Sequence, residues 1–168
     1  MASNRSNAVI VGFKQVIAQP SDLDTVRKIV EKTINQIYPL YYPRDVVQLF
    51  LEHHAPDRIL TDIDAGYVYL FLIDSAIVVG TGTIYGNEIR RVFVLPEYQG
   101  RGYGSVIMQQ LEGMVFRTYR IVKLDSSLPA FGMYLKRGYK SHAWRKIVTP
   151  SGQFLCYHEM QKENLQAP

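Results

Sequence analysis

The sequence predicts an α/β fold (α+β in the finer division), in which seven strands are flanked by helices. Three observations lead to this prediction. The first third of the chain has apolar residues at helical spacing, and the segment after Gly66 has β-prone runs separated by short turns. Beyond Leu95, helix and strand patterns alternate before a closing hairpin. With 168 residues the chain is long enough to bury a core of its own, so we expect a single domain over 1–168.

The segments before Gly66 predict one strand and three helices. Val9 to Ala18 is mainly apolar and predicts the opening strand. The first helix is expected to begin with Ser21 as its N-cap, because Asp24 stands three residues on in capping-box position. The three helices are expected at about 21–36, 45–54 and 56–63.

The segments after Gly66 predict six more strands and two more helices. The first three of these strands are joined by short turns at Asp74-Ser75 and Gly86-Asn87, which is typical of an antiparallel meander. We expect an ordered core over about 8–162 and a frayed tail at 163–168. The six strands are expected at 67–73, 76–85, 88–95, 120–124, 139–148 and 153–161, and the two helices at about 104–118 and 129–137.

Composition excludes several classes of protein. The formal charge of +4 comes from basic residues that are mostly scattered, so nucleic-acid binding is not expected. No apolar run approaches the roughly 20 residues of a membrane helix, and the first residues lack an apolar signal core. The single cysteine, Cys156, excludes an internal disulfide and fits a reducing compartment. We therefore expect a cytoplasmic protein without a membrane partner.

The stretch from Glu88 to Ser105 carries the clearest functional signal. An apolar strand is stopped by Pro96, and Gly100, Gly102 and Gly104 then leave the loop almost without side chains, so that its amides can approach a ligand closely. A helix begins at once, and the N-terminus of a helix attracts anions. Ser105 stands where a dinucleotide-binding G-x-G-x-x-G would have its third glycine, and no Gly-Lys-Ser/Thr is present.

The order Val94-x-Pro96, then Gln99-x-x-Gly102-x-Gly104, resembles motif A of the GCN5-related N-acetyltransferase (GNAT) superfamily. A second block also resembles that family, in which Asn-x-x-Ala-x-x-x-Tyr-x-x-x-Gly-Phe is usual. Here Ser127 replaces the asparagine, and the other matching positions are Ala130, Tyr134, Gly138 and Tyr139. The resemblance implies the GNAT fold, a mixed and mostly antiparallel central sheet of about seven strands. It also implies acetyl coenzyme A (acetyl-CoA) as co-substrate.

The resemblance further implies which residues hold this co-substrate. The loop would bind its pyrophosphate mainly through backbone amides, and the amide of Val94 or Leu95 would polarise the thioester carbonyl. Ser127 offers a shorter hydrogen-bonding side chain than the asparagine that is usual at this position. The expected loop residues are Gln99, Gly100, Arg101, Gly102, Tyr103, Gly104 and Ser105, and the expected residues of the second block are Ser127, Ala130 and Tyr134.

Two residues are expected to be catalytic. Tyr134 matches a tyrosine that in many family members protonates the departing thiolate, which a phenol with a pKa near 10 can do at neutral pH. Glu88 precedes Gln99 by eleven positions, as does the glutamate that serves as base in histone acetyltransferase members. A charged residue at the start of a strand is the alternative interpretation of Glu88. The cluster Tyr38, Tyr41 and Tyr42 is expected to contact the acceptor, unless it only packs between two helices.

Other sites and functions receive less support. His53 and His54 are adjacent on a predicted helix, so they cannot share a face, and no metal site is expected. One alternative is a non-catalytic module of the same fold that binds coenzyme A. Another is a dinucleotide-binding protein in which Asp125 would hold a ribose. The main hypothesis is an acetyl-CoA-dependent N-acetyltransferase for an unidentified small-molecule or peptide amine; a homodimer is left open.

Overall fold

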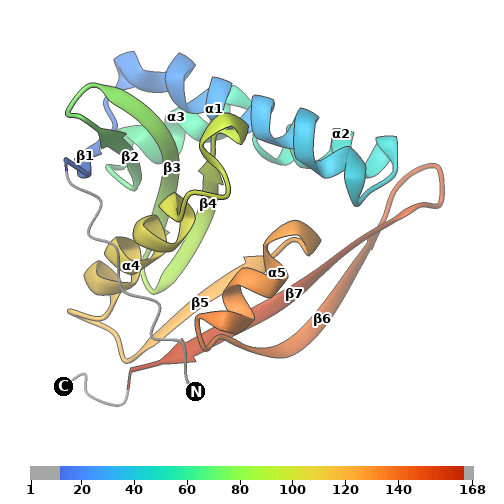
Figure 1. The fold of residues 1–168 in the computed structure, drawn as a ribbon. Coiled ribbons are helices and arrows are strands. Elements are labelled where there is room, and N and C mark those ends of the chain that lie inside the picture. Colours follow the sequence, from blue (N-terminus) through green and yellow to red (C-terminus); the bar gives the residue numbers. More distant parts are fainter. Residues whose placement is uncertain (1–11, 165–168) are drawn as a thin grey trace.

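One mixed sheet organises the chain (Figure 1). The computed structural model describes residues 12–164. The sheet has seven strands in the order β1-β2-β3-β4-β5-β7-β6, and every neighbouring pair is antiparallel except β4 and β5. The strands are β1 (Lys14–Ile17), β2 (Val68–Ile73), β3 (Ile77–Tyr85), β4 (Glu88–Val94), β5 (Ile121–Ser126), β6 (Lys140–Val148) and β7 (Phe154–Glu163).

Helices cover both faces of this sheet (Figure 1). On one face, the first three helices pack with Phe93 and Leu155 into one buried cluster. On the other face, the last two helices pack with Ile89, Leu124 and Met160 into a second cluster. The helices are α1 (Leu23–Ile37), α2 (Arg44–His53), α3 (Pro56–Asp64), α4 (Tyr103–Val115) and α5 (Leu128–Lys136), and short 3-10 turns lie at Pro20–Asp22, Tyr38–Leu40 and Pro96–Tyr98.

The two parallel strands in the middle of the sheet separate soon after they meet. β4 and β5 share a single register pair, Glu88 with Lys123, whereas β5 pairs with β7 along its whole length. β4 is also irregular, because Arg91 has a φ of 50° and the pairing with β3 shifts register between Thr81 and Thr83. Such a bulge bends a strand and strengthens its twist. The sheet therefore opens between the carboxyl ends of β4 and β5.

The predicted architecture is confirmed, with small differences at the ends of elements. The seven predicted strands and five helices correspond to those observed; residues 9–11 of the first predicted strand lie outside the described part. The predicted cap at Ser21 is wrong, because a 3-10 turn precedes α1 and the Asp22 carboxylate accepts the Gln19 amide at 2.8 Å. The dinucleotide-binding alternative is also wrong, since that fold needs a mostly parallel sheet.

Candidate active site

A cleft of about 820 Å³ opens where β4 and β5 separate. Its lining residues come mainly from the motif-A loop, α2, α5, β4, β5 and β7. A cleft of this size is large enough for a cofactor-sized ligand. Among the residues that the sequence singled out, those lining the cleft are Tyr38, Glu88, Val94, Gln99, Gly100, Gly102, Tyr103, Gly104, Ser105, Asp125, Ser127, Ala130 and Tyr134.

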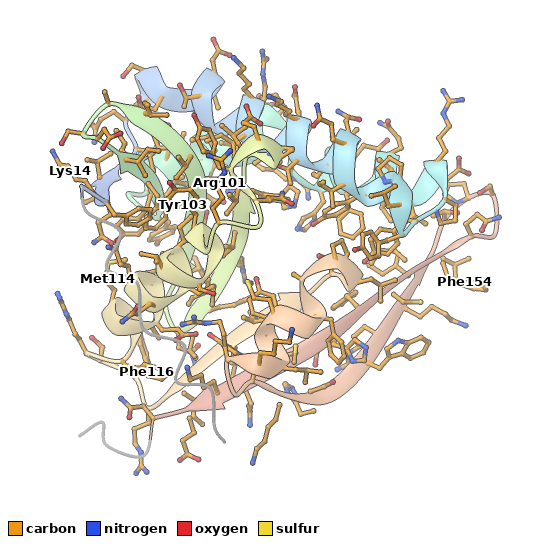
Figure 2. The ribbon with its side chains drawn as sticks, viewed as in Figure 1. Lys14, Arg101, Tyr103, Met114, Phe116 and Phe154 are labelled. Atoms are coloured by element: carbon orange, nitrogen blue, oxygen red, sulfur yellow. The ribbon has the colours of Figure 1, made fainter. Side chains whose placement is uncertain are left out.

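The loop before α4, where Figure 2 labels Arg101 and Tyr103, lies at the edge of the cleft and leaves backbone amides free. Gly102 is the N-cap of α4 and has a φ of 87°, which an ordinary L-residue adopts only with strain. The first helical amide bonds are those of Ser105 and Val106 to the Gly102 carbonyl, so the amides of Tyr103 and Gly104 have no partner within the helix. A Cβ at Gly102 would meet no atom within 4 Å. The loop therefore has few side chains, leaves space above Gly102, and lies at the positive end of the helix dipole.

The end of β4 presents one amide to the cleft. The Leu95 amide donates to the Val79 carbonyl at 2.9 Å, so it is already used within the sheet. Successive amides of a strand point to opposite sides, and the Val94 amide therefore points away from β3 toward the opening. Gln99 also lines the cleft, and its Nε2 donates to the Val94 carbonyl at 2.9 Å. Of the two amides predicted from the sequence, only that of Val94 is available.

α5 brings Tyr134 into the same cleft. Its ring is 5% exposed, and burial raises the pKa of its phenol above the usual value. Ser127, which replaces the asparagine of the resembling family, is the N-cap of α5, but its hydroxyl makes no capping bond. It accepts a hydrogen bond of 3.3 Å from the Tyr38 hydroxyl instead. Tyr38 thereby connects the end of α1 to the start of α5.

The other two tyrosines of the predicted acceptor cluster do not line the cleft. Tyr41 is 50% exposed on the outer surface, whereas Tyr42 is 6% exposed. The Tyr42 hydroxyl accepts the amide hydrogen of Leu128, the first residue of α5, at 2.7 Å. Burial raises the pKa of Tyr42 to about 12, so the hydroxyl stays protonated at neutral pH. Tyr42 caps a helix in place of the Ser127 side chain.

Tyr42→Phe should therefore destabilise the fold without changing the cleft. The substitution leaves the Leu128 amide without its partner, and an unsatisfied buried donor costs about 1–3 kcal/mol. Urea unfolding would measure this loss. Tyr41→Phe is the matched control and should leave the unfolding free energy unchanged. Equal stability of the Tyr42 variant and the wild type would contradict the capping role.

The wall formed by β4, β5 and β7 carries charge. Glu88, at the start of β4, forms an ion pair with Arg90 of the same strand. Asp125, on β5, lies two residues beyond Lys123, the partner of Glu88. Partial burial and the neighbouring carboxylates Glu88 and Glu159 raise the pKa of Asp125. Two acidic side chains of this wall thus line the cleft, and of these two only Glu88 forms an ion pair with an arginine.

A network that also lines the cleft ties β4 to α3. Arg91 is 7% exposed at its side chain and pairs with Asp62 of α3 at 2.7 Å. Its Nε also donates to Nδ1 of His54 at 3.4 Å. Burial lowers the pKa of His54 to about 3, and the neighbouring arginine contributes in the same direction. His54 is therefore a neutral acceptor that holds Arg91 at the bulge of β4.

The structure thus brings most of the predicted site together but leaves some residues out. Leu95, Arg101, Tyr41 and Tyr42 do not line the cleft, and Arg101 lies over the ring of Tyr98 at 5.7 Å. No local sequence pattern indicates the role of Arg91 or of Tyr42 as a cap, because both depend on distant partners. Within residues 12–164, no cluster of three or more His, Cys, Asp or Glu side chains could hold a metal ion. Nor does any helix of this described part have the length and apolar character to cross a membrane.

The model of the acetyltransferase (GNAT) domain family matches residues 38–163. No curated protein sequence matches the chain. Among solved structures, the GCN5-related N-acetyltransferase from Rhodopseudomonas palustris is 20% identical with a TM-score of 0.81, covering 95% of this chain and 100% of that one. The PaiA N-acetyltransferase from Thermoplasma acidophilum, in complex with coenzyme A, is 17% identical with a TM-score of 0.68 over 90% and 99% of the two chains. YncA from Salmonella typhimurium, with its cofactor acetyl-CoA, is 16% identical with a TM-score of 0.67, and the match covers 93% of this chain and 97% of that one.

Proposed function

The chain belongs to the GNAT family of acetyltransferases, and from this premise we propose that it transfers the acetyl group of acetyl-CoA to a primary amine. We infer a direct attack, with both substrates held in one complex. The observation that carries the proposal is the meeting of three groups in one cleft: the bare loop at α4, the free amide of Val94 and the hydroxyl of Tyr134. Much of the rate enhancement would then come from positioning.

The residues at the start of α4 fit the phosphates of such a co-substrate. Gly102 leaves space above the backbone, and the unpaired amides of Tyr103 and Gly104 point out of the helix start. Backbone amides and the positive end of the helix dipole together bind phosphate groups. When bound, acetyl-CoA supplies an activated thioester. We place its acetyl end beyond Val94, where the sheet opens.

Two groups of the chain would assist the departure of the thiol. The Val94 amide would donate to the carbonyl oxygen, where negative charge develops during attack. The Tyr134 hydroxyl would give its proton to the departing sulfur, because it reaches the cleft and burial keeps it protonated. On the acceptor side, the ammonium must lose a proton before its nitrogen can attack, and a carboxylate of the cleft would accept this proton. Glu88 and Asp125 both line that side.

A turnover assay would test this proposal. The purified chain would be incubated with acetyl-CoA and a panel of small amines and peptides, and thiol release would be followed with mass spectrometry of the products. We expect thiol release that depends on at least one amine, with a product heavier by one acetyl group. A thermal shift with coenzyme A but no transfer to any amine would favour the non-catalytic coenzyme A-binding module. A shift with NAD alone would overturn the assignment of the cofactor.

A further inference from the structure

We propose that Asp125, rather than Glu88, binds the ammonium group of the acceptor and accepts its proton, and that this acceptor carries one ammonium on an apolar body. This proposal rests on the acetyltransferase function proposed above. It adds a catalytic residue and a class of substrate. The evidence is the pairing of the charged side chains around the cleft, together with the apolar side chains that complete its wall.

Three carboxylates meet on this part of the sheet, and two of them already have cationic partners. Glu88 is paired with Arg90. Glu159, the cross-strand partner of Asp125, is held by Arg145 at 2.7 Å and lies 3.5 Å from His142. Across residues 12–164, Asp125 forms neither an ion pair nor a side-chain hydrogen bond, and it is exposed to the cleft that it lines. Glu52 of α2 also lines the cleft, but its carboxylate already accepts a hydrogen bond of 3.1 Å from Gln48. Among the described residues that line the cleft, Asp125 is therefore the carboxylate that neither a cation nor a side-chain hydrogen bond occupies.

The surroundings of Asp125 make a bound cation favourable. Glu88 and Arg90 face it from β4, Tyr157 and Glu159 from β7, and His142 and Arg145 from β6. Burial, followed by the charges of Glu88 and Glu159, outweighs the arginine and raises the pKa of Asp125. A nearby ammonium relieves this unfavourable charge. A carboxylate with a raised pKa is also a better proton acceptor than an ordinary aspartate.

The apolar side chains that line the cleft indicate which chemical group the acceptor carries next to its ammonium. Leu49 and Phe50 of α2, Phe93 of β4 and Leu155 of β7 line the cleft on the same side of the sheet as Asp125. Arg58 of α3 also lines it; among the described residues it forms no ion pair, so it would repel a second positive charge. A polyamine is therefore disfavoured. The lining suits an amine with one ammonium next to an aromatic or aliphatic group.

The proton balance of this step is simple. Asp125 takes one proton from the ammonium, and the nitrogen lone pair then forms the bond to the acetyl carbon. The carbon–sulfur bond breaks, and its electron pair stays on sulfur, which takes the Tyr134 proton. The second proton of the nitrogen returns to Tyr134 through solvent, and Asp125 releases its proton to solvent. Each turnover thus yields one amide, one thiol and one free proton.

The experiment measures acetyl transfer to 2-phenylethylamine by the full chain, with spermidine for comparison. Asp125→Asn should lower kcat/KM for the amine about a hundredfold or more, as loss of a general base typically does. The affinity for acetyl-CoA should not change. Glu88→Gln should cost less than about tenfold, because Asp125 remains. Full activity of the Asp125 variant, an equal loss of acetyl-CoA binding, or a preference for spermidine would each overturn the proposal.

The pH dependence of activity distinguishes a proton acceptor from a residue with a purely structural role. Asp125 must be ionised to accept a proton, so activity should fall as pH drops through its pKa. Glu159→Gln removes one of the charges that raise this pKa, and the acidic limb should move to lower pH while neutral activity remains. An unmoved limb would overturn the assignment to Asp125. No transfer by the wild type to any amine of the wider panel would instead refute the acetyltransferase proposal itself.

Discussion

Tyr134→Phe should lower kcat for acetyl transfer by about a hundredfold to ten-thousandfold, the usual contribution of a general acid. The ring would still fill its buried site beside Tyr139, so the fold and the affinity for acetyl-CoA should be retained. The loss should shrink with an acetyl thioester whose thiol has a lower pKa, because that thiolate needs less help to depart. Steady-state kinetics with the two donors would measure both effects.

The pH dependence of this loss follows from the burial of Tyr134. An acid acts only while protonated, and burial raises the pKa of this phenol above its ordinary value near 10. The hydroxyl therefore stays protonated from neutral to moderately alkaline pH, and the ratio of wild-type to variant kcat should stay constant from about pH 7 to 9.5. Tyr38→Phe is the matched control, since it removes a cleft hydroxyl that is bound to Ser127. Full activity of the Tyr134 variant would leave solvent as the proton donor.

Gly102→Val should weaken the binding of acetyl-CoA more than tenfold, or by more than about 1.4 kcal/mol. The branched side chain would stand in the open space over the loop, where a phosphate must approach the amides of α4. Titration calorimetry would measure the affinity. Unchanged binding in a folded variant would refute the assignment of this loop to phosphate.

Backbone strain must be separated from this effect, because Gly102 has a φ of 87°. Gly138, which follows α5, offers a matched control: it has the same φ, and a Cβ there would also meet no atom within 4 Å. It does not line the cleft. Gly138→Val should therefore carry a similar conformational penalty and leave the binding of acetyl-CoA intact. Equal losses of affinity in both variants would show that strain, and not the blocked loop, causes the effect.

The elements of the fold and the position of the loop follow from local features of the sequence. Hydrophobic periodicity and turn residues act over short distances, so strands such as 88–95 and helices such as 104–118 could be predicted from adjacent residues alone. The glycines around Gly102 have the same local character, because a bare loop before a helix needs no distant partner. These are the parts in which prediction and structure agree.

The partners of the side chains in the site depend instead on how distant segments pack together. From the sequence, Tyr42 could contact the acceptor or pack between two helices, whereas its hydroxyl caps a helix that begins 86 positions later. The amide of Leu95 is taken by the neighbouring strand, and Arg91 finds its acidic partner 29 positions earlier, on α3. Asp125 forms no ion pair within the described part of the chain, because β7 separates its strand, β5, from β6. Arg145 of β6 pairs instead with Glu159 of β7. Which polar group is satisfied and which remains free depends on contacts between distant segments, and these contacts form only when the sheet is assembled.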